Sequence, residues 1–144
     1  MIVRPIKTRI FRENESLEHF IHAHVRRLPE RSILVVTSKI VALAEGRTEP
    51  GGNETRKIQL IKQESDLAIR TKYTWLTVRD GAVLASAGID ESNADGKFIL
   101  LPKDSYKTAE KLRQALRRHY KIRRLGVLIT DSRLLPLRSG VVGI

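Results

Sequence analysis

The sequence has 144 residues, with 27 Lys plus Arg against 16 Asp plus Glu and a formal net charge of +11. It contains no cysteine, which excludes disulfides, thiolate metal sites and a cysteine nucleophile. No stretch approaches the ~20 apolar residues that span a bilayer, and the N-terminus has no run typical of a signal peptide, so we expect a cytoplasmic protein without a membrane partner.

The beginning of the chain predicts a strand, a helix and a second strand. Residues 1–6 can form a short first strand. Apolar side chains at helical spacing predict an amphipathic helix over residues 15–28, ending near Pro29. The continuous apolar run at residues 33–36 is typical of a buried strand.

The middle of the first half is less regular. A short apolar-periodic segment covers residues 40–44, directly after Thr37 and Ser38. Residues 49–55 contain a Pro-Gly-Gly-Asn run and predict a loop. A helix is predicted over residues 57–69.

The second half begins with the strongest local signal in the chain. Extended segments at residues 73–78 and 82–87 are separated by Arg79-Asp80-Gly81, and Asp-Gly between such segments predicts a β-hairpin. An acidic, turn-rich loop follows at residues 88–96.

Three further elements are predicted after that loop. Residues 98–101 form a short strand that Pro102 stops, and Asp104 or Ser105 can cap the helix that follows. Residues 125–130 form a last buried strand.

This order of elements predicts the fold class. Strands and helices mix without a strict βαβ repeat, which favours an α+β fold, a mixed α/β sheet with flanking helices. No linker divides the chain, so we expect one domain over residues 1–144. The apolar run at residues 139–144 has no polar tail after it, so we expect a chain truncated at its C-terminus.

Two segments place oxygen ligands beside a strand end. The first, residues 88–93, contains Asp90 and Asn93 and could hold Mg²⁺ or Mn²⁺, although such residues are also ordinary turn formers. It is not an EF-hand loop, because Leu101 occupies the position of the twelfth-residue acid. The second is Asp131-Ser132, which follows the last buried strand and could equally be a helix cap or turn.

A third segment offers groups for a phosphate. Ser38 and Lys39 follow the buried strand at residues 33–36, where hydroxyls, an ammonium group and backbone amides could hold an anion. The segment lacks the glycines of a Walker loop, and an ordinary helix cap explains it as well.

Three blocks of the sequence together resemble one family. They are ILVVTSKIVALAEGR at 33–47, DGAVLASAGIDESNADGKFILLPKDS at 80–105 and LGVLITDSRLLPLRSGVVGI at 125–144. The chain resembles the coenzyme F-420:L-glutamate ligase family (F-420-0 γ-glutamyl ligases), and more closely its bacterial relatives described as folate-metabolism γ-glutamate ligases. The blocks occur in the order of the family and together span nearly the whole chain, and the family extends well beyond residue 144.

The resemblance implies an amide-forming enzyme. GTP or ATP, with Mg²⁺ or Mn²⁺, would activate a carboxylate of a phosphorylated or acidic cofactor-like acceptor as an acyl phosphate, and L-glutamate would attack it. The family fold is a mixed α/β structure that forms a homodimer.

The resemblance also implies roles for particular residues. Asp90, Asp131 and Ser132 would bind the metal. Ser38, Lys39 and Asn93 would contact the nucleotide, and so would Thr8 and Arg9 within residues 7–10.

The chain departs from the deazaflavin-specific ligases at two places. Leu43 stands where they tend to have a lysine, and residues 132–138 replace an SFGRPWR-like run. Both departures favour a folate-like acceptor. Two alternatives stay open: a non-catalytic ligand-binding module of the same fold and a basic nucleic-acid-binding domain, the latter disfavoured because the few aromatics do not alternate with basic residues.

Overall fold

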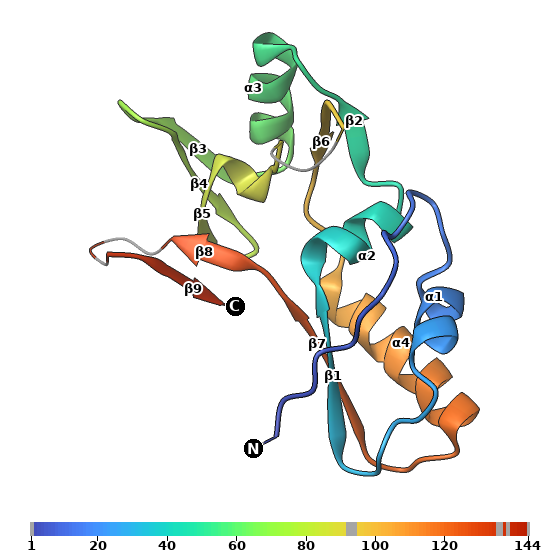
Figure 1. Cartoon of the computed structure of the whole chain (residues 1–144). Helices are drawn as coiled ribbons and strands as arrows, with labels where there is room; N and C mark the ends of the chain where they lie inside the picture. The colour runs from blue at the N-terminus through green and yellow to red at the C-terminus, as the bar shows by residue number, and fades with distance from the viewer. Residues whose placement is uncertain (1, 92–94, 135–136, 138, 144) are drawn as a thin grey trace. The chain divides into compact units, whose positions relative to one another are not determined.

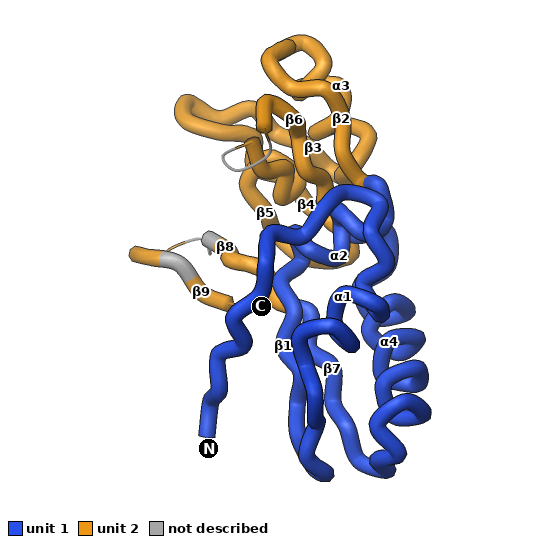
Figure 2. The backbone as a smooth tube through the Cα atoms, turned by 45° about the vertical axis from the view of Figure 1, so that its right-hand side comes forward, with its two compact units in different colours: residues 1–46, 102–129 blue, residues 47–101, 130–144 orange. Residues whose placement is uncertain are grey.

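The computed structural model describes residues 2–91, 95–134, 137 and 139–143. It forms two compact units, each built from two stretches of the chain (Figure 2). Unit 1 consists of Met1–Gly46 and Pro102–Ile129, and unit 2 of Arg47–Leu101 and Thr130–Ile144. Helices and small sheets are mixed within the chain, so the fold class is α+β, as predicted.

Unit 1 is a pair of strands with helices on one face (Figure 1). Its elements are α1 (Leu17–His24), β1 (Ser32–Thr37), α2 (Ser38–Ala44), α4 (Ser105–Tyr120) and β7 (Leu125–Thr130), whose last residue falls in unit 2. Strands β1 and β7 are neighbours. Arg31 N donates to Arg124 O before the strands begin, and Ile33 packs against Gly126 just inside them, so the two strands run in the same direction.

The core of unit 1 lies between these strands and the helices. Leu34 and Leu125 from the strands pack with Leu112 and Leu116 from α4, and Leu116 is fully buried. Successive side chains of a strand point to opposite faces, so the residues next to Leu34 in the chain lie on the other face of the pair. Ile33, one of these residues, is 68% exposed. One face of the pair is therefore covered and the other is open within this unit.

Helices α1 and α4 begin at side-chain caps. Ser16 Oγ accepts from His19 N at 3.3 Å, and Asp104 Oδ1 accepts from Lys107 N at 2.8 Å. The predicted cap of the second helix is confirmed. The first helix is shorter than the predicted 15–28, because Val25 is already extended and the chain runs on to Pro29, which disfavours helix before it.

Unit 2 is built from antiparallel pairs. Its elements are β2 (Thr48–Pro50), α3 (Glu54–Gln63), β3 (Leu67–Arg70), β4 (Trp75–Arg79), β5 (Ala82–Ala85), a 3₁₀ turn η1 (Ser86–Gly88), β6 (Lys97–Ile99), β8 (Ser132–Leu134) and β9 (Val141–Gly143). β2 pairs with β6, β8 pairs with β9, and β3–β4–β5 form a three-stranded sheet.

The predicted hairpin is confirmed as β4 and β5. Asp80 and Gly81 both adopt positive φ, 51° and 72°, which is the geometry of a type I′ turn. Thr77, on the covered face, is fully buried, and its hydroxyl donates to Leu84 O at 2.8 Å.

Three predicted elements of the first half are wrong. Residues 2–6 form no strand, because no described segment pairs with them. Residues 49 and 50 of the predicted loop belong to β2, residues 48–50, because β6 lies beside them. The predicted helix 57–69 begins earlier and ends at Gln63, and its second part, residues 67–70, instead pairs with β4. Local periodicity could not reveal these partners.

Candidate functional site

Asp90 is held by backbone hydrogen bonds on both sides. Its N donates to Ile99 O at 2.9 Å and its O accepts from Ile99 N at 2.8 Å. Its side-chain Oδ2 is buried. This isolated bridge fixes the backbone of Asp90 beside Ile99, the last residue of β6 in unit 2.

The chain reaches Asp90 through a tight left-handed turn. Ala87 and Gly88 both have positive φ, 55° and 71°. A Cβ on Gly88 would lie 2.8 Å from the Leu101 side chain, so glycine is required there by both conformation and space. The turn at Ala87 and Gly88 therefore restricts the backbone conformation that leads into Asp90.

Basic side chains surround the acidic loop. Lys57 Nζ, from α3, lies 2.7 Å from Glu91 Oε2. Arg56 Nη2 lies 3.0 Å from Glu49 Oε2. The pairing of Lys57 with Glu91 could not be predicted along the chain, because the two residues are 34 positions apart. Asn93, the predicted nucleotide contact in the same loop, lies outside the described residues.

Ser38 and Lys39 lie directly after β1 in unit 1. Ser38 is buried and opens the seven-residue helix α2, whose preceding residue, Thr37, makes no side-chain cap. No acidic residue occupies the first turn of this helix. The two side chains therefore begin at the carboxyl end of a sheet strand, as the sequence predicted.

Strand β7 ends at the same edge of its sheet as β1, because the two strands run in the same direction. Asp131 is the next residue of the chain after β7, and Ser132 begins β8. Ligand-binding groups commonly follow the carboxyl ends of parallel strands. Parallel pairing, which the sequence could not show, places the carboxyl ends of β1 and β7 at one edge of this sheet.

Arg9 has an internal partner. Its guanidinium donates to both carboxylate oxygens of Glu15, Nη1 to Oε2 at 2.9 Å, and lies 4.9 Å from the centre of the Phe20 ring. This hydrogen bond is the main reason why the pKa of Arg9 is raised and that of Glu15 is lowered. A nucleotide contact by Arg9 would have to share its donors with Glu15, whereas Thr8 beside it is exposed.

The residues fit a divalent cation only together with other oxygen ligands. Within the described ranges, no three or more His, Cys, Asp or Glu side chains gather in one place. Asp90 and Asp131 are separate carboxylates, and hard cations such as Mg²⁺ are commonly bound through one or two carboxylates plus substrate phosphates and water. The donor set therefore suits a metal that arrives with a phosphate ligand. Among the described helices, none is long and apolar enough to cross a membrane.

Comparison with known proteins gives consistent matches. Residues 48–144 match the family model described as F420-0:Gamma-glutamyl ligase. The coenzyme F420:L-glutamate ligase of Methanopyrus kandleri is 33% identical over 97% of this chain and 62% of its own length. That of Methanothermobacter thermautotrophicus is 33% identical over 81% of this chain and 54% of its own length. That of Methanosarcina acetivorans is 30% identical over 96% and 61%. The chain thus spans less than two thirds of the length of these relatives.

Proposed function

The chain belongs to the F420-0:gamma-glutamyl ligase family. On that premise we propose that it functions as part or all of a nucleotide- and divalent-metal-dependent γ-glutamyl ligase. The reaction attaches L-glutamate to a carboxylate acceptor, a folate-like or deazaflavin cofactor. We further propose that both units form one ligase-like domain and that the reaction takes place in the cytoplasm, where nucleotides and L-glutamate are available.

The proposed chemistry has two steps. An acceptor carboxylate oxygen attacks the γ-phosphorus of GTP or ATP, which forms an acyl phosphate and releases the nucleoside diphosphate. The amine of L-glutamate then attacks the acyl carbon, inorganic phosphate leaves, and the amine loses a proton to give the amide. Positioning of the reactants and neutralisation of phosphate charge supply much of the catalysis in such reactions.

The metal-binding roles fall on oxygen ligands. We assign Asp90, Asp131 and Ser132 to Mg²⁺ or Mn²⁺, which would neutralise the nucleotide phosphates when bound. The observation that carries this proposal is the position of Asp90, whose two backbone groups are bonded to Ile99 and whose Oδ2 is already removed from water. A carboxylate oxygen that is already out of water loses little further hydration when it binds a cation.

The nucleotide-binding roles fall on Ser38, Lys39 and Asn93, with Thr8 and Arg9 as further contacts. The position of Ser38 and Lys39 after a parallel strand supports this assignment. The pairing of Arg9 with Glu15 makes it the weakest of these contacts.

We propose a folate-like acceptor in preference to a deazaflavin. Leu43 lies near the end of α2 and packs against the core of unit 1, so it offers no charge where a lysine would. The second departure, residues 132–138, falls partly outside the described residues.

A homodimer is supported by an open apolar sheet face in unit 2. The register of β3–β4–β5 places six apolar side chains on one face: Leu67, Ile69, Leu76, Val78, Val83 and Ala85. Leu67 is 51% exposed and Ile69 is 49% exposed. A second copy covering this face would remove it from water, and light scattering of the purified protein measures whether that copy is present.

Ligand-induced thermal stabilisation tests the proposed site. The protein is heated with GTP or ATP, each with Mg²⁺, with Mn²⁺ or with EDTA. A ligand at 100 times its dissociation constant should stabilise the protein by about 2.7 kcal/mol. Asp90→Asn should abolish the metal-dependent part. Asp80→Asn is the matched control, because it removes a carboxylate of the same unit at an exposed turn.

The outcomes separate the alternatives. Stabilisation that requires both nucleotide and metal, and that Asp90→Asn removes, supports the ligase site. Equal stabilisation of Asp90→Asn and wild type contradicts the metal assignment. Binding without phosphate release or incorporation of labelled L-glutamate into folate-like and deazaflavin acceptors would instead favour the non-catalytic binding module.

A further inference from the structure

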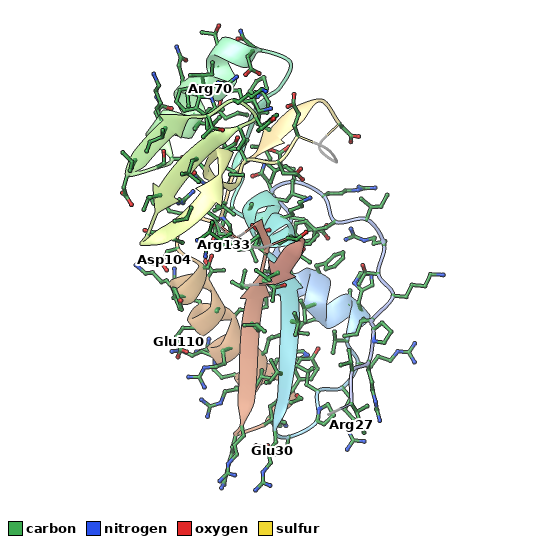
Figure 3. The ribbon with its side chains drawn as sticks, turned by 90° about the vertical axis from the view of Figure 1, so that its left-hand side faces the viewer. Arg27, Glu30, Arg70, Asp104, Glu110 and Arg133 are labelled. Atoms are coloured by element: carbon green, nitrogen blue, oxygen red, sulfur yellow. The ribbon has the colours of Figure 1, made fainter. Side chains whose placement is uncertain are left out.

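A polar pocket lies in unit 1, at the edge where β1 and β7 begin. It has a volume of about 530 Å³, and its lining includes Arg26, Arg27, Glu30, His119 and Tyr120. Figure 3 shows Arg27 and Glu30 beside this end of the two strands. Ser38 follows the opposite end of β1, and a six-residue strand spans roughly 20 Å, so this pocket is separate from the proposed nucleotide segment.

The two arginines of the pocket have no internal counter-ion. Neither Arg26 nor Arg27 forms an ion pair with any residue that the structure describes. The one carboxylate of the lining, Glu30, accepts from Arg123 N at 3.0 Å and from Arg124 N. The hydrogen bond from Arg123 N is the main reason why the pKa of Glu30 is lowered. Glu30 therefore joins two loops through backbone donors and leaves both guanidinium groups available.

The surroundings of the pocket are strongly basic. Five cations lie at the end of α4 and in the segment that follows it: Arg117, Arg118, Lys121, Arg123 and Arg124. None of them forms an ion pair with a residue that the structure describes. Cations concentrated around a concave surface focus a positive potential and raise the local concentration of anions.

Rings build a rigid wall beside the arginines. His119 stacks on His22 with 3.7 Å between ring centres and an angle of 15°. Tyr120 meets His119 edge-on at 4.7 Å, and its hydroxyl donates to Val25 O, next to Arg26. The wall is therefore tied to the same loop that carries the two arginines.

We infer that this pocket binds a phosphate-bearing small molecule, with Arg26 and Arg27 holding the phosphate and His119 and Tyr120 contacting the group attached to it. Guanidinium groups bind phosphate through paired hydrogen bonds and keep their charge at every physiological pH. The groups converge on one concavity instead of following an extended groove, which favours a small ligand over a nucleic-acid strand. The inference does not depend on the proposed ligase activity.

Pyrophosphate is the probe that tests this site. The complete chain is labelled with ¹⁵N and titrated with pyrophosphate in EDTA, so that metal-dependent nucleotide binding does not contribute. We expect saturable shifts in the amides of Arg26, Arg27 and His119. In the double variant Arg26→Gln and Arg27→Gln, affinity should fall at least about tenfold, because charge-assisted hydrogen bonds are lost.

A charge-matched variant separates a site from general attraction. Lys107→Gln with Lys111→Gln removes two positive charges from the exposed part of α4, away from the pocket lining, and should keep affinity within about twofold of wild type. The proposal is overturned by absence of saturable shifts, by equal losses in both double variants, or by shifts centred on Ser38 and Lys39. Tighter binding of single-stranded oligonucleotide than of pyrophosphate, with a steep salt dependence, would assign the surface to nucleic acid instead.

Discussion

The two units divide the charge of the chain unequally. Unit 1 contains 17 Lys plus Arg against 7 Asp plus Glu, whereas unit 2 contains 10 against 9. Nearly all of the net charge of +11 therefore belongs to unit 1. An argument from net charge to an anionic partner concerns that unit, and the carboxylates proposed for metal binding belong to the other.

The units also use their charges differently. In unit 2, Glu64 lies between Arg47 and Arg79, with Arg79 Nη1 at 2.8 Å and the Arg47 contact closer. These three side chains are only 13–23% exposed. In unit 1, Arg9 pairs with Glu15 and Arg113 pairs with Glu110, and both are local pairs. Cations of unit 2 thus hold the unit together, while many in unit 1 face solvent.

The largest expected effect is a loss of stability in unit 1 that unit 2 does not share. Leu116→Ala removes a fully buried side chain from unit 1 and should lower the free energy of unfolding by about 3 kcal/mol. Two probes follow the units in denaturant: far-UV circular dichroism reports mainly helix α4 and its neighbours, and fluorescence of Trp75, the single tryptophan, reports unit 2. We expect the helix signal to move further than the fluorescence.

Leu67→Ala is the control for this prediction, because its side chain is 51% exposed and its loss should cost under about 1 kcal/mol. If both probes shift equally in Leu116→Ala, the units unfold as one cooperative body and the comparison loses its energetic meaning.

The next effect tests the central ion pair of unit 2. Glu64→Gln leaves two arginines close together without their carboxylate and should cost about 2 kcal/mol, less than a fully buried pair because the groups keep partial exposure. Glu15→Gln breaks the more exposed pair of unit 1, where Arg9 is 49% exposed, and should cost less. Urea midpoints measure both, and a larger loss in Glu15→Gln would reverse the distinction drawn between the units.

The smallest effect is a pH dependence in unit 1. Hydrogen bonds from Arg113, and then from Gln114, lower the pKa of Glu110 from 4.5 to about 2. Between these values the folded protein binds fewer protons than the unfolded chain, so this stabilisation is present above pH 4.5 and is lost as the pH falls toward 2. The melting temperature of Glu110→Gln should therefore lie slightly below wild type at neutral pH and converge with it near pH 2.

Arg113→Gln checks the cause, because it removes the main hydrogen bond and leaves the carboxylate in place. The difference in melting temperature between Arg113→Gln and wild type should therefore change with pH in much the same way as that of Glu110→Gln. A wild-type slope in Arg113→Gln would show that another group produces it.

The sequence by itself determined the elements whose signals are local. Asp80-Gly81 specified a turn with two positive φ values, and Asp104 specified the start of α4 through a hydrogen bond three residues away. The apolar run at residues 125–130 specified β7 with its observed bounds. The polar residues around Asp90 and Asp131 were identified as candidate ligands from type and order alone.

Tertiary structure decided what depends on distant partners. The parallel pairing of β1 with β7 joins residues more than 90 positions apart, and Glu30 is bonded to Arg123 at a separation of 93. Residues 67–70 became a strand because β4 lies beside them, and Arg26 gained a pocket because α4 ends nearby. Caps and turns act within a few residues and can be read along the chain, whereas strand pairing, pockets and the separation of charge arise only when the closed chain brings remote groups together.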